Sequence, residues 1–437
     1  MKERVLIVGS GAREHAIAAA VVRAGAEVIC FGSARNPGID ALSAKYMVGK
    51  INDGAAVAAF AKEHGATLAV IGPEAPLAAG VADALWAAGV KTVGPTKSLA
   101  RIESSKGFAR ELLAKHGIPG NPFFRRFDSM NGVEEVLRAW DMRHVIKDDG
   151  LAGGKGVKVC GDHLHSLANS MDCCRELVAL GHPFVIEERL EGEEFSLMSF
   201  CDGNTLQHMP AVQDHKRADN GDKGPNTGGM GTYTDANGKL PFLADDDLRE
   251  AKNINQLVAA ALEKECGEPY RGILYGGFMA TRDGVKLIEY NARFGDPECL
   301  NVLTLLKTDV LRIFRGVVDQ TLADFIVEFE SDASVCKYVV PDGYPDQPRV
   351  GDEVVLPNDL PQGVTMYLGA VDVKDGELVA TGSRTVGVVG VAETIADAEN
   401  ICENVVQEIP GRFFHRADIG TAELIAKRVE HMKAVRS

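Results

Sequence analysis

The segment VKLIEYNARFGDPE, residues 285–298, joins an apolar strand to a dense group of polar side chains. Side chains two positions apart on a strand point to the same face, so Glu289 and Asn291 are expected side by side. They offer a carboxylate and an amide oxygen, and magnesium at nucleotide sites is held by one or two such groups plus substrate phosphates. Arg293 could bind a phosphate or carboxylate through two hydrogen bonds. A solvated, charged turn would contain the same residue types.

Composition and charge exclude several classes of protein. The chain has 437 residues, 45% hydrophobic and 25% charged, which is typical of a globular protein, and its length predicts about three domains. The net charge of −15 argues against a general nucleic-acid surface, and no apolar run could span a membrane. The start, MKERVLIVGSG, has no signal-peptide pattern, and the nine scattered cysteines suit reduced thiols. We therefore expect a cytoplasmic protein.

The first 100 residues alternate between strand and helix patterns. A strand at 4–8 leads into the glycine turn at 9–11, a helix to about 24 and a strand at 27–31. The turn would let an anion approach the helix N-terminus. A nicotinamide dinucleotide would need a glycine in place of Glu14 and an acidic residue after the second strand, so an oxidoreductase is disfavoured. A single phosphate near Arg13 and His15 fits better.

Two further segments offer ligand-binding residues. Glu74, in LAVIGPEAPL (68–77), is expected at the carboxyl end of a parallel strand, which is the usual ligand-binding edge. Ser105 is a suitable cap for a helix that runs to about residue 116. Lys106 then lies in the first turn, against the helix dipole, and a bound anion would explain its position.

Three polar stretches follow. The glycine-rich loop from Gly150 to Gly156 lies between strand patterns rather than before a helix, which predicts a lid over phosphates and not a Walker A loop. The acidic stretch 187–194 could bind a ribose and an adenine edge. The run 213–233 includes amides suited to an anion, and so long a loop is usually functional. From about residue 330, short strands and a helix at 395–408 predict an α+β module.

Several blocks, in order, closely resemble the phosphoribosylamine-glycine ligase family of the ATP-grasp superfamily. The resemblance runs over about residues 4–420 and rests on GSGAREHA (9–16), GPEAPL (72–77), GPTK (94–97), SSKGFA (104–109), KDDGLAGGKGV (147–157), EERLEGEEFS (187–196), QDHKRADNGDKGPNTGGMG (213–231), EYNARFGDPE (289–298) and FFHRADIG (413–420). It implies a multidomain α/β and α+β fold. The parts would be a Rossmann-like (pre-ATP-grasp) domain at 1–103, ATP-grasp lobes at 104–328 with a lid lobe at about 122–190, and a C-terminal α+β module at 329–437.

The resemblance also implies an activity. ATP, glycine and 5-phosphoribosylamine would give ADP, phosphate and glycinamide ribonucleotide, the second step of purine synthesis. The γ-phosphoryl group would first move to the glycine carboxylate, and the amine would then attack the acyl phosphate. No protein nucleophile is needed, so catalysis would depend on positioning and charge. The implied cofactors are ATP and Mg²⁺ or Mn²⁺, and the implied state is a monomer.

Roles carried over from the family fall into four groups. Metal ligands would be Glu289 and Asn291, and catalytic residues would be Arg293, Lys147 and Asp214. Nucleotide-binding residues would be Lys106, Lys147, Gly150, Gly153, Gly154, Lys155, Gly156, Glu187, Glu188, Leu190 and Glu194. Substrate-binding residues would be Gly9, Gly11, Arg13, Glu74, Asp214, Asn226, Thr227, Gly228 and Asp296.

The chain departs from the family pattern at a few positions. Asp148 replaces a common alanine, Ala292 a frequent cysteine, and Ser383 the second of two glycines before an arginine. The nearest alternative is another ATP-grasp enzyme of the purine pathway, such as a carboxylase or a formate-dependent transformylase. A non-catalytic binding module would require loss of the metal or phosphate residues, which are present.

Overall fold

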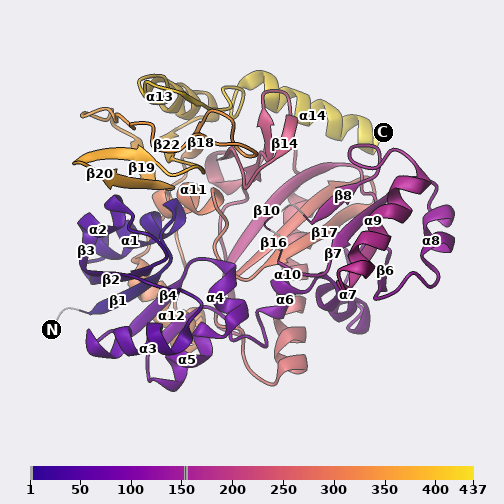
Figure 1. Cartoon of the computed structure of the whole chain (residues 1–437), viewed down its shortest axis with the longest axis horizontal. Coiled ribbons are helices and arrows are strands. Elements are labelled where there is room, and N and C mark those ends of the chain that lie inside the picture. Colours follow the sequence, from indigo (N-terminus) through magenta and orange to yellow (C-terminus); the bar gives the residue numbers. More distant parts are fainter. Residues whose placement is uncertain (1–2, 152, 154–155) are drawn as a thin grey trace.

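The structure is a computed structural model that describes residues 3–151, 153 and 156–437. Its N-terminal part is a five-stranded parallel sheet in the order β3-β2-β1-β4-β5 (Figure 1). The strands are β1 (Arg4–Val8), β2 (Glu27–Gly32), β3 (Ser43–Val48), β4 (Leu68–Ile71) and β5 (Lys91–Val93). The helices are α1 (Ala12–Arg23), α2 (Pro37–Leu42), α3 (Gly54–Glu63), α4 (Glu74–Ala79) and α5 (Val81–Ala87). The strand order reverses between β1 and β4, where ligands bind in such sheets.

A small antiparallel sheet, in the order β6-β9-β7-β8, forms a lobe at one side of the molecule (Figure 1). It consists of β6 (Phe124–Phe127), β7 (His144–Asp148), β8 (Val157–Val159), β9 (Phe184–Glu188), α8 (Val133–Ala139) and α9 (Leu167–Ala179). Its core is separate from the main core and includes Leu137, Ile146 and Phe184. The helices α6 (Arg101–Ser104) and α7 (Lys106–Lys115) connect this lobe to the N-terminal sheet.

The central sheet has the order β11-β10-β16-β17, and all neighbouring strands are antiparallel. Its strands are β10 (Glu193–Cys201), β11 (Leu206–His208), β16 (Gly272–Thr281) and β17 (Gly284–Asn291), so Glu193 and Glu194 begin a strand rather than end a turn. The long helix α10 (Asp245–Cys266) contacts β10, β16 and β17. Three helical segments follow, α11 (Glu298–Thr304), α12 (Val310–Asp319) and η2 (Leu322–Asp324).

The third large sheet joins two distant parts of the sequence. Strands β12 (Gln213–Asp214) and β15 (Gly231–Thr234) pair beside β18 (Ala333–Pro341), which is followed in the sheet by β22 (Val386–Ala392) and β19 (Val364–Leu368); β23 (Phe413–Phe414) also pairs with β18. The expected loop at 213–233 is thus partly strand, and it also contains the hairpin of β13 (Arg217–Asp219) and β14 (Lys223–Asn226). Strand β15 pairs with β18, about a hundred residues away, so the local pattern could not predict it.

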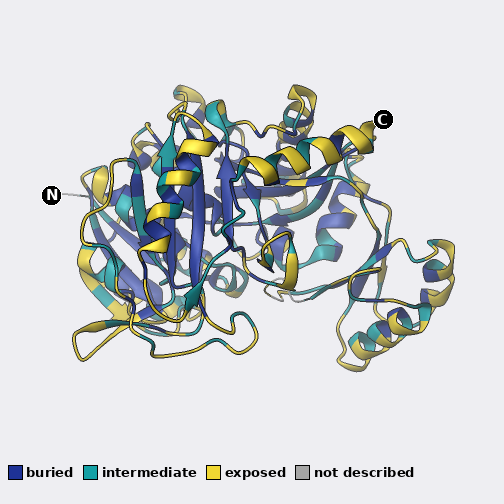
Figure 2. Cartoon of the chain, turned by 90° about the horizontal axis from the view of Figure 1, so that it is seen from above, coloured by how far each residue is buried: buried dark blue, intermediate teal, exposed yellow. Residues whose placement is uncertain are grey.

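The C-terminal part completes the fold. It contains the hairpin of β20 (Val371–Lys374) and β21 (Glu377–Ala380) and the helices α13 (Ile395–Gln407) and α14 (Ala422–Arg436). The short helix η1 (Ala236–Gly238), from the middle of the chain, contacts its strand β18. Helix α14 was not predicted from the sequence. Figure 2 shows buried strands enclosed by helices whose outer faces are exposed. The multidomain α/β and α+β architecture is confirmed, while the boundaries at 103 and 328 stay predictions.

Two observations concern the environment of the protein. All nine cysteines are free thiols in the structure. Among the described residues, no helix combines the length and the apolar character needed to cross a membrane.

Candidate active site

A cavity of about 1040 Å³ is lined by residues from several sheets. Its walls include residues from the N-terminal sheet, the small lobe, the central sheet, the C-terminal module and α14, for example Arg13, Lys147, Glu289, Arg384 and Arg428. These positions span most of the sequence. The cavity therefore depends on how the domains pack, and not on any one motif.

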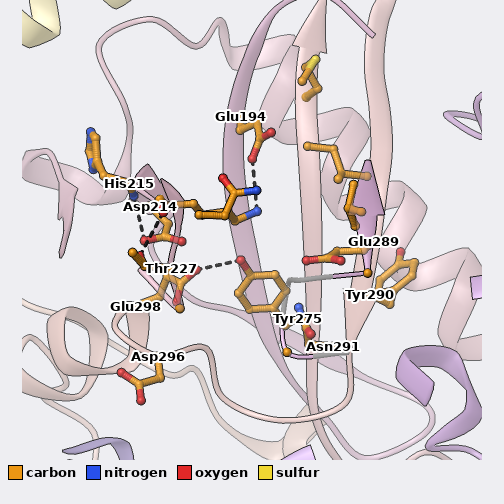
Figure 3. A pocket seen from close by; sticks show the side chains of 18 of the residues that line it. Glu194, Asp214, His215, Thr227, Tyr275, Glu289, Tyr290, Asn291, Asp296 and Glu298 are labelled. Carbon is orange, nitrogen blue, oxygen red and sulfur yellow. Dashed lines mark hydrogen bonds and ion pairs between the residues drawn. The ribbon is translucent and has the colours of Figure 1, made fainter. Parts of the chain in front are cut away.

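Glu289 and Asn291 end strand β17 and line the cavity, as Figure 3 shows. They pair with Gly277 and Tyr275 of β16. Burial alone would raise the pKa of Glu289, but Lys216, Lys147 and Lys106 together lower it below its usual range. Its carboxylate accepts no hydrogen bond from the residues that the structure describes. The carboxylate is therefore ionised and free to bind a cation.

A register shift between β16 and β17 leaves Ile288 without a partner on β16. Its carbonyl oxygen instead accepts hydrogen bonds from Arg110 Nη2 at 2.7 Å and Lys147 Nζ at 2.9 Å. The bulge thereby connects the strand that bears the metal candidates to two cations from other elements.

Lys147 lies on β7 and forms an ion pair with Glu187 of β9, with a distance of 2.7 Å between Nζ and Oε2. Glu187 also accepts two hydrogen bonds from Arg110, at 2.7 and 2.8 Å. Burial would raise the pKa of Glu187, but Arg110 and Lys147 lower it to about 2. This pairing orients Lys147 in the wall and leaves a net positive charge in the group of three.

The start of the glycine-rich loop is bound to the N-terminus of α7. Asp149 Oδ1 accepts hydrogen bonds from Ser105 Oγ at 2.9 Å and Gly107 N at 3.0 Å, and Lys106 Nζ donates to Gly150 O at 2.7 Å. The expected hairpin is confirmed, since β7 and β8 pair on either side of the loop. Gly153 and Gly156 line the cavity, whereas Gly154 and Lys155 lie outside the described residues.

Arg293 is held by two carboxylates from the N-terminal part. Its Nη2 lies 3.1 Å from Glu103 Oε1, and its Nε lies 3.7 Å from Glu74 Oε2. Glu103 also accepts a hydrogen bond from the backbone N–H of Ala292 at 2.8 Å. Arg293 Nη2 donates to Asn291 Oδ1 at 3.2 Å, so the guanidinium orients the neighbouring metal candidate.

Acidic side chains form another part of the cavity wall. Tyr275 donates a hydrogen bond to Glu298 at 2.7 Å, and Asp214 lies nearby (Figure 3). Burial, followed by the charge of Glu298, raises the pKa of Asp214 well above its usual range. Lys216 lies 3.3 Å from Glu194, and the charge of Glu194 raises the pKa of Lys216. The raised pKa means that Asp214 and Glu298 resist carrying two negative charges together, and a substrate ammonium group beside them would offset that repulsion.

The segment 226–229 closes one side of this wall. Thr227 donates from its backbone and side chain to Lys216 O, at 2.7 and 2.9 Å. Gly229 has a φ of +112°, and a Cβ there would lie 2.7 Å from Asp214 Oδ1. Arg384 donates to Gly228 O at 2.7 Å and pairs with Asp296 at 3.0 Å, so Asp296 reaches the cavity already bound to a cation.

The glycine turn at the N-terminus contacts a carboxylate of the chain itself. The Gly11 N–H donates to Glu14 Oε2 at 2.6 Å, and Arg13 Nε donates to Glu14 Oε1 at 2.6 Å. His15 points instead to strand β19, where its Nδ1 accepts a hydrogen bond from Leu368 N at 2.9 Å. The Gly11 N–H expected to meet a phosphate is thus bound to Glu14, and His15 is not among the residues that line the cavity.

Most of the predicted site residues line one cavity. They are Arg13, Glu74, Lys106, Lys147, Gly153, Gly156, Glu187, Glu194, Asp214, Asn226, Thr227, Gly228, Glu289, Asn291, Arg293 and Asp296. The predicted residues Gly9, Gly11, Gly150, Glu188 and Leu190 are not part of its lining. Glu188 points to the other face of β9, as alternation along a strand requires, and accepts a hydrogen bond from Phe123 N at 2.9 Å.

Sequence reasoning missed several lining residues. Arg110 is one helical turn after Lys106, so helical spacing could have placed both on one face. Glu103 lies two residues before the helix cap Ser105. Arg384 and Arg428 have no local signal, because they reach the cavity through packing of the C-terminal module.

Comparison with known families shows that three domain models match nearly the whole chain. These are the phosphoribosylglycinamide synthetase N domain at residues 3–103, the ATP-grasp (A) domain at 104–299 and the C domain at 334–422. The chain is also similar to solved structures of lower identity. The biotin carboxylase domain of a Hydrogenobacter thermophilus 2-oxoglutarate carboxylase has a TM-score of 0.71 at 15% identity, over 99% of this chain and 94% of that one, which shows a shared fold alone.

More similar proteins share one name. Phosphoribosylamine–glycine ligase of Methanosarcina acetivorans is 47% identical, over 100% of this chain and 98% of the relative. The corresponding protein of Methanosarcina barkeri is 46% identical over 99% and 100%. The crystal structure of phosphoribosylamine–glycine ligase from Thermotoga maritima has a TM-score of 0.82 at 28% identity, covering 95% of this chain and 99% of that one. With three matching domain models and full-length relatives, the chain belongs to the phosphoribosylamine–glycine ligase family.

Proposed function

We propose that the protein joins glycine to 5-phosphoribosylamine with conversion of ATP to ADP and phosphate, giving glycinamide ribonucleotide in the second step of purine synthesis. The observation that carries the proposal is that one cavity holds two groups of charged side chains. Glu289 and Asn291 lie among the cations Lys106 and Lys147, and the acidic pair of Asp214 and Glu298 faces the same space. Such a cavity suits a metal-bound polyphosphate beside an amine.

The residues present fit a divalent cation, Mg²⁺ or Mn²⁺, held by Glu289 and Asn291. The Glu289 carboxylate is ionised, and it has no hydrogen-bond partner among the described residues. No group of three or more His, Cys, Asp or Glu side chains suited to a metal occurs in that part of the chain, so phosphates and water would complete the coordination. When bound, the ion would neutralise phosphate charge.

The nucleotide would lie between the small lobe and the central sheet. Lys106 and Lys147 would bind its phosphates, and the loop from Gly150 to Gly156 would cover them. The stretch 187–190 would line the adenine, and Glu194 would meet the ribose. In the structure Glu194 is paired with Lys216. A bound ribose hydroxyl would either replace Lys216 as the partner of the Glu194 carboxylate or share the carboxylate with it.

The reaction would proceed in two displacements. A glycine carboxylate oxygen forms a bond to the γ-phosphorus while the bond to the ADP oxygen breaks, and Arg293 stabilises the transferring group. The amine of phosphoribosylamine then attacks the carbonyl carbon of glycyl phosphate, phosphate leaves, and the amine loses a proton. Asp214 and Glu298 would hold the ammonium group of glycine, while Arg13, Glu74, Asp296 and the segment 226–228 would face phosphoribosylamine.

Release of ADP tests this proposal directly. The purified protein would be given ATP and Mg²⁺ with glycine alone, with phosphoribosylamine generated in place alone, and with both. We expect ADP only with both substrates, in equal amount to glycinamide ribonucleotide. ADP formation that depends on bicarbonate or formate would contradict the proposal and favour a carboxylase or a transformylase of the same superfamily.

Expectations about the oligomeric state, location, partners and domains accompany the proposal. We infer a monomer that acts in the cytoplasm on small molecules, with no role for nucleic acid or membranes. We also infer that units 1–103, 104–328 and 329–437 fold as domains; the domain models, at 3–103, 104–299 and 334–422, support the boundary at 103. Light scattering of the purified protein would test the first point.

A further inference from the structure

Helix α14 forms part of the cavity wall although all but its first residue lies beyond the segments that the three domain models match. Lys427, Arg428 and His431 line the cavity. The helix contacts β10 and β16 and runs along the central sheet, as Figure 1 shows. Because three basic side chains of one helix line the cavity, their contacts with other parts of the site decide what α14 contributes.

Arg428 bridges two elements of the site that are far apart in sequence. Its Nη2 donates to Asp222 Oδ2 at 2.5 Å, and its Nε lies 3.5 Å from Glu193 Oε2. Asp222 is in the turn between β13 and β14, and Glu193 is the first residue of β10. His431 lies 2.6 Å from the second carboxylate oxygen of Glu193 and supports the same contact.

The turn that bears Asp222 is fixed from a second direction. Arg416 Nη1 donates to Asp222 Oδ1 at 2.8 Å, and Asp418 accepts a hydrogen bond from Gly221 N at 2.9 Å. The Arg416 side chain is fully buried. Burial would raise the pKa of Asp222, but Arg428 and Arg416 lower it to about 2, so the carboxylate stays ionised. Movement of this turn would separate partly buried charges, which is unfavourable.

Each partner of Arg428 is joined by the backbone to a proposed ligand-binding residue. Strand β14 ends at Asn226 and runs directly into Thr227 and Gly228, which line the substrate side. Glu193 immediately precedes Glu194, which lines the nucleotide side. We propose that Arg428 is a positioning residue that fixes the segment 226–229 relative to strand β10 through Asp222 and Glu193. This inference rests on the proposed function and adds α14 to the machinery of the site.

Steady-state kinetics of Arg428→Gln test the proposal. We expect the KM for glycine or phosphoribosylamine to rise at least about tenfold, because small displacements of substrate-positioning groups have effects of this size or larger. The KM for ATP should change less, because Lys106 on α7 and Lys147 on β7 would hold the phosphates, and only Glu194 connects Arg428 to the nucleotide side. Lys433→Gln is the matched control: it removes the same charge one turn later, from an exposed side chain without an ion pair among the described residues.

A double-mutant cycle and hydrogen exchange separate positioning from general stability. Asp222→Asn should raise the same KM, and the double variant Asp222→Asn/Arg428→Gln should be no worse than the more impaired single variant. Arg428→Gln should also speed amide exchange in residues 217–231, whereas Lys433→Gln should not. These exchange data do not depend on turnover.

The outcomes distinguish this inference from the proposed function. If the native protein forms no glycinamide ribonucleotide, the proposed function fails. If it does so and Arg428→Gln leaves every KM and the exchange of 217–231 unchanged, only the role of Arg428 is overturned. A fall in thermal stability with all three KM values unchanged would likewise overturn it, because the residue would then be structural.

Discussion

At the scale of single residues, the cavity combines ionised groups of both signs that are buried together. Glu187 has two cationic partners, and Arg293 has two anionic partners. Such pairing offsets the cost of desolvation and fixes side-chain direction at the same time. Glu289 differs, because no described residue donates to its carboxylate. The Glu289 carboxylate is therefore the group on which metal binding would depend.

Glu289→Gln therefore tests the metal site. The amide keeps the size of the side chain but removes its charge, so we expect kcat to fall by about a hundredfold or more, equivalent to about 2.7 kcal/mol or more of lost transition-state stabilisation. The measurement is ADP release as a function of Mg²⁺ concentration. Glu134→Gln is the control, since Glu134 forms an exposed pair with Arg138 on α8. Near-native turnover at saturating Mg²⁺ would show that Glu289 is not a ligand.

The residues of the site differ in how far the sequence could predict them. The side-by-side position of Glu289 and Asn291 could be predicted from the alternation of side chains along a strand, because both residues lie on β17. Arg384 and Arg428 could not be predicted, since each reaches the cavity through contacts with Asp296 or Asp222, far away in sequence. The anion expected at the glycine turn stays a prediction. Glu14 lies three residues after Gly11, but only the folded helix shows that its carboxylate takes the Gly11 N–H.

At the scale of elements, the N-terminus of α7 connects helix stability to the glycine-rich loop. Ser105 accepts a hydrogen bond from Phe108 N at 3.1 Å and donates to Asp149 at 2.9 Å. The sequence predicted the cap and the hairpin correctly, because both depend on residues close together in the chain. It did not predict that Asp149 joins them, since that contact spans two elements.

Ser105→Ala should weaken both features. Loss of a serine cap costs about 1 kcal/mol, and loss of the contact with Asp149 should also raise the KM for ATP. The measurements are thermal unfolding and the KM for ATP. Ser166→Ala is a matched control, because Ser166 caps α9 through Asn169 N at 3.1 Å and is not part of the cavity lining. Equal KM values for ATP in the two variants would argue against a link between α7 and the loop.

At the scale of the whole molecule, one hydrophobic core extends from the N-terminal sheet through the central sheet into the C-terminal module. The small lobe has its own core, and so does part of the C-terminal module. Polar contacts also cross between these parts. Asn36 donates to Leu368 O at 2.7 Å, and His15 accepts from the N–H of the same residue. The small lobe is therefore the part best able to move separately.

The contact of His15 with Leu368 makes stability depend on pH. Burial lowers the pKa of His15 to about 4, so the folded protein holds the neutral ring, while the unfolded chain takes up a proton below about pH 6.5. Acidification from pH 6.5 towards 4 must then favour unfolding. His15→Gln should be less stable at pH 7.5, but its deficit should shrink by at most about 2 kcal/mol at pH 5.

Thermal midpoints at pH 7.5 and 5.0 provide the measurement. His165→Gln is the control, because His165 is exposed and distant from Leu368 in the chain. The expectation is a smaller drop in the midpoint for His15→Gln than for the native protein and the control. Equal drops in all three proteins would show that His15 does not carry this dependence.

The place of α14 in the cavity wall has a consequence for protein synthesis. Domains of a nascent chain fold as they leave the ribosome, the N-terminal ones first. The sheet that provides Arg13 and the strands that provide Glu289 can thus form while translation continues. Arg428 and His431 join the wall only after they too have emerged. We therefore expect unfinished polypeptides that lack α14 to hold most of the fold but not a complete site.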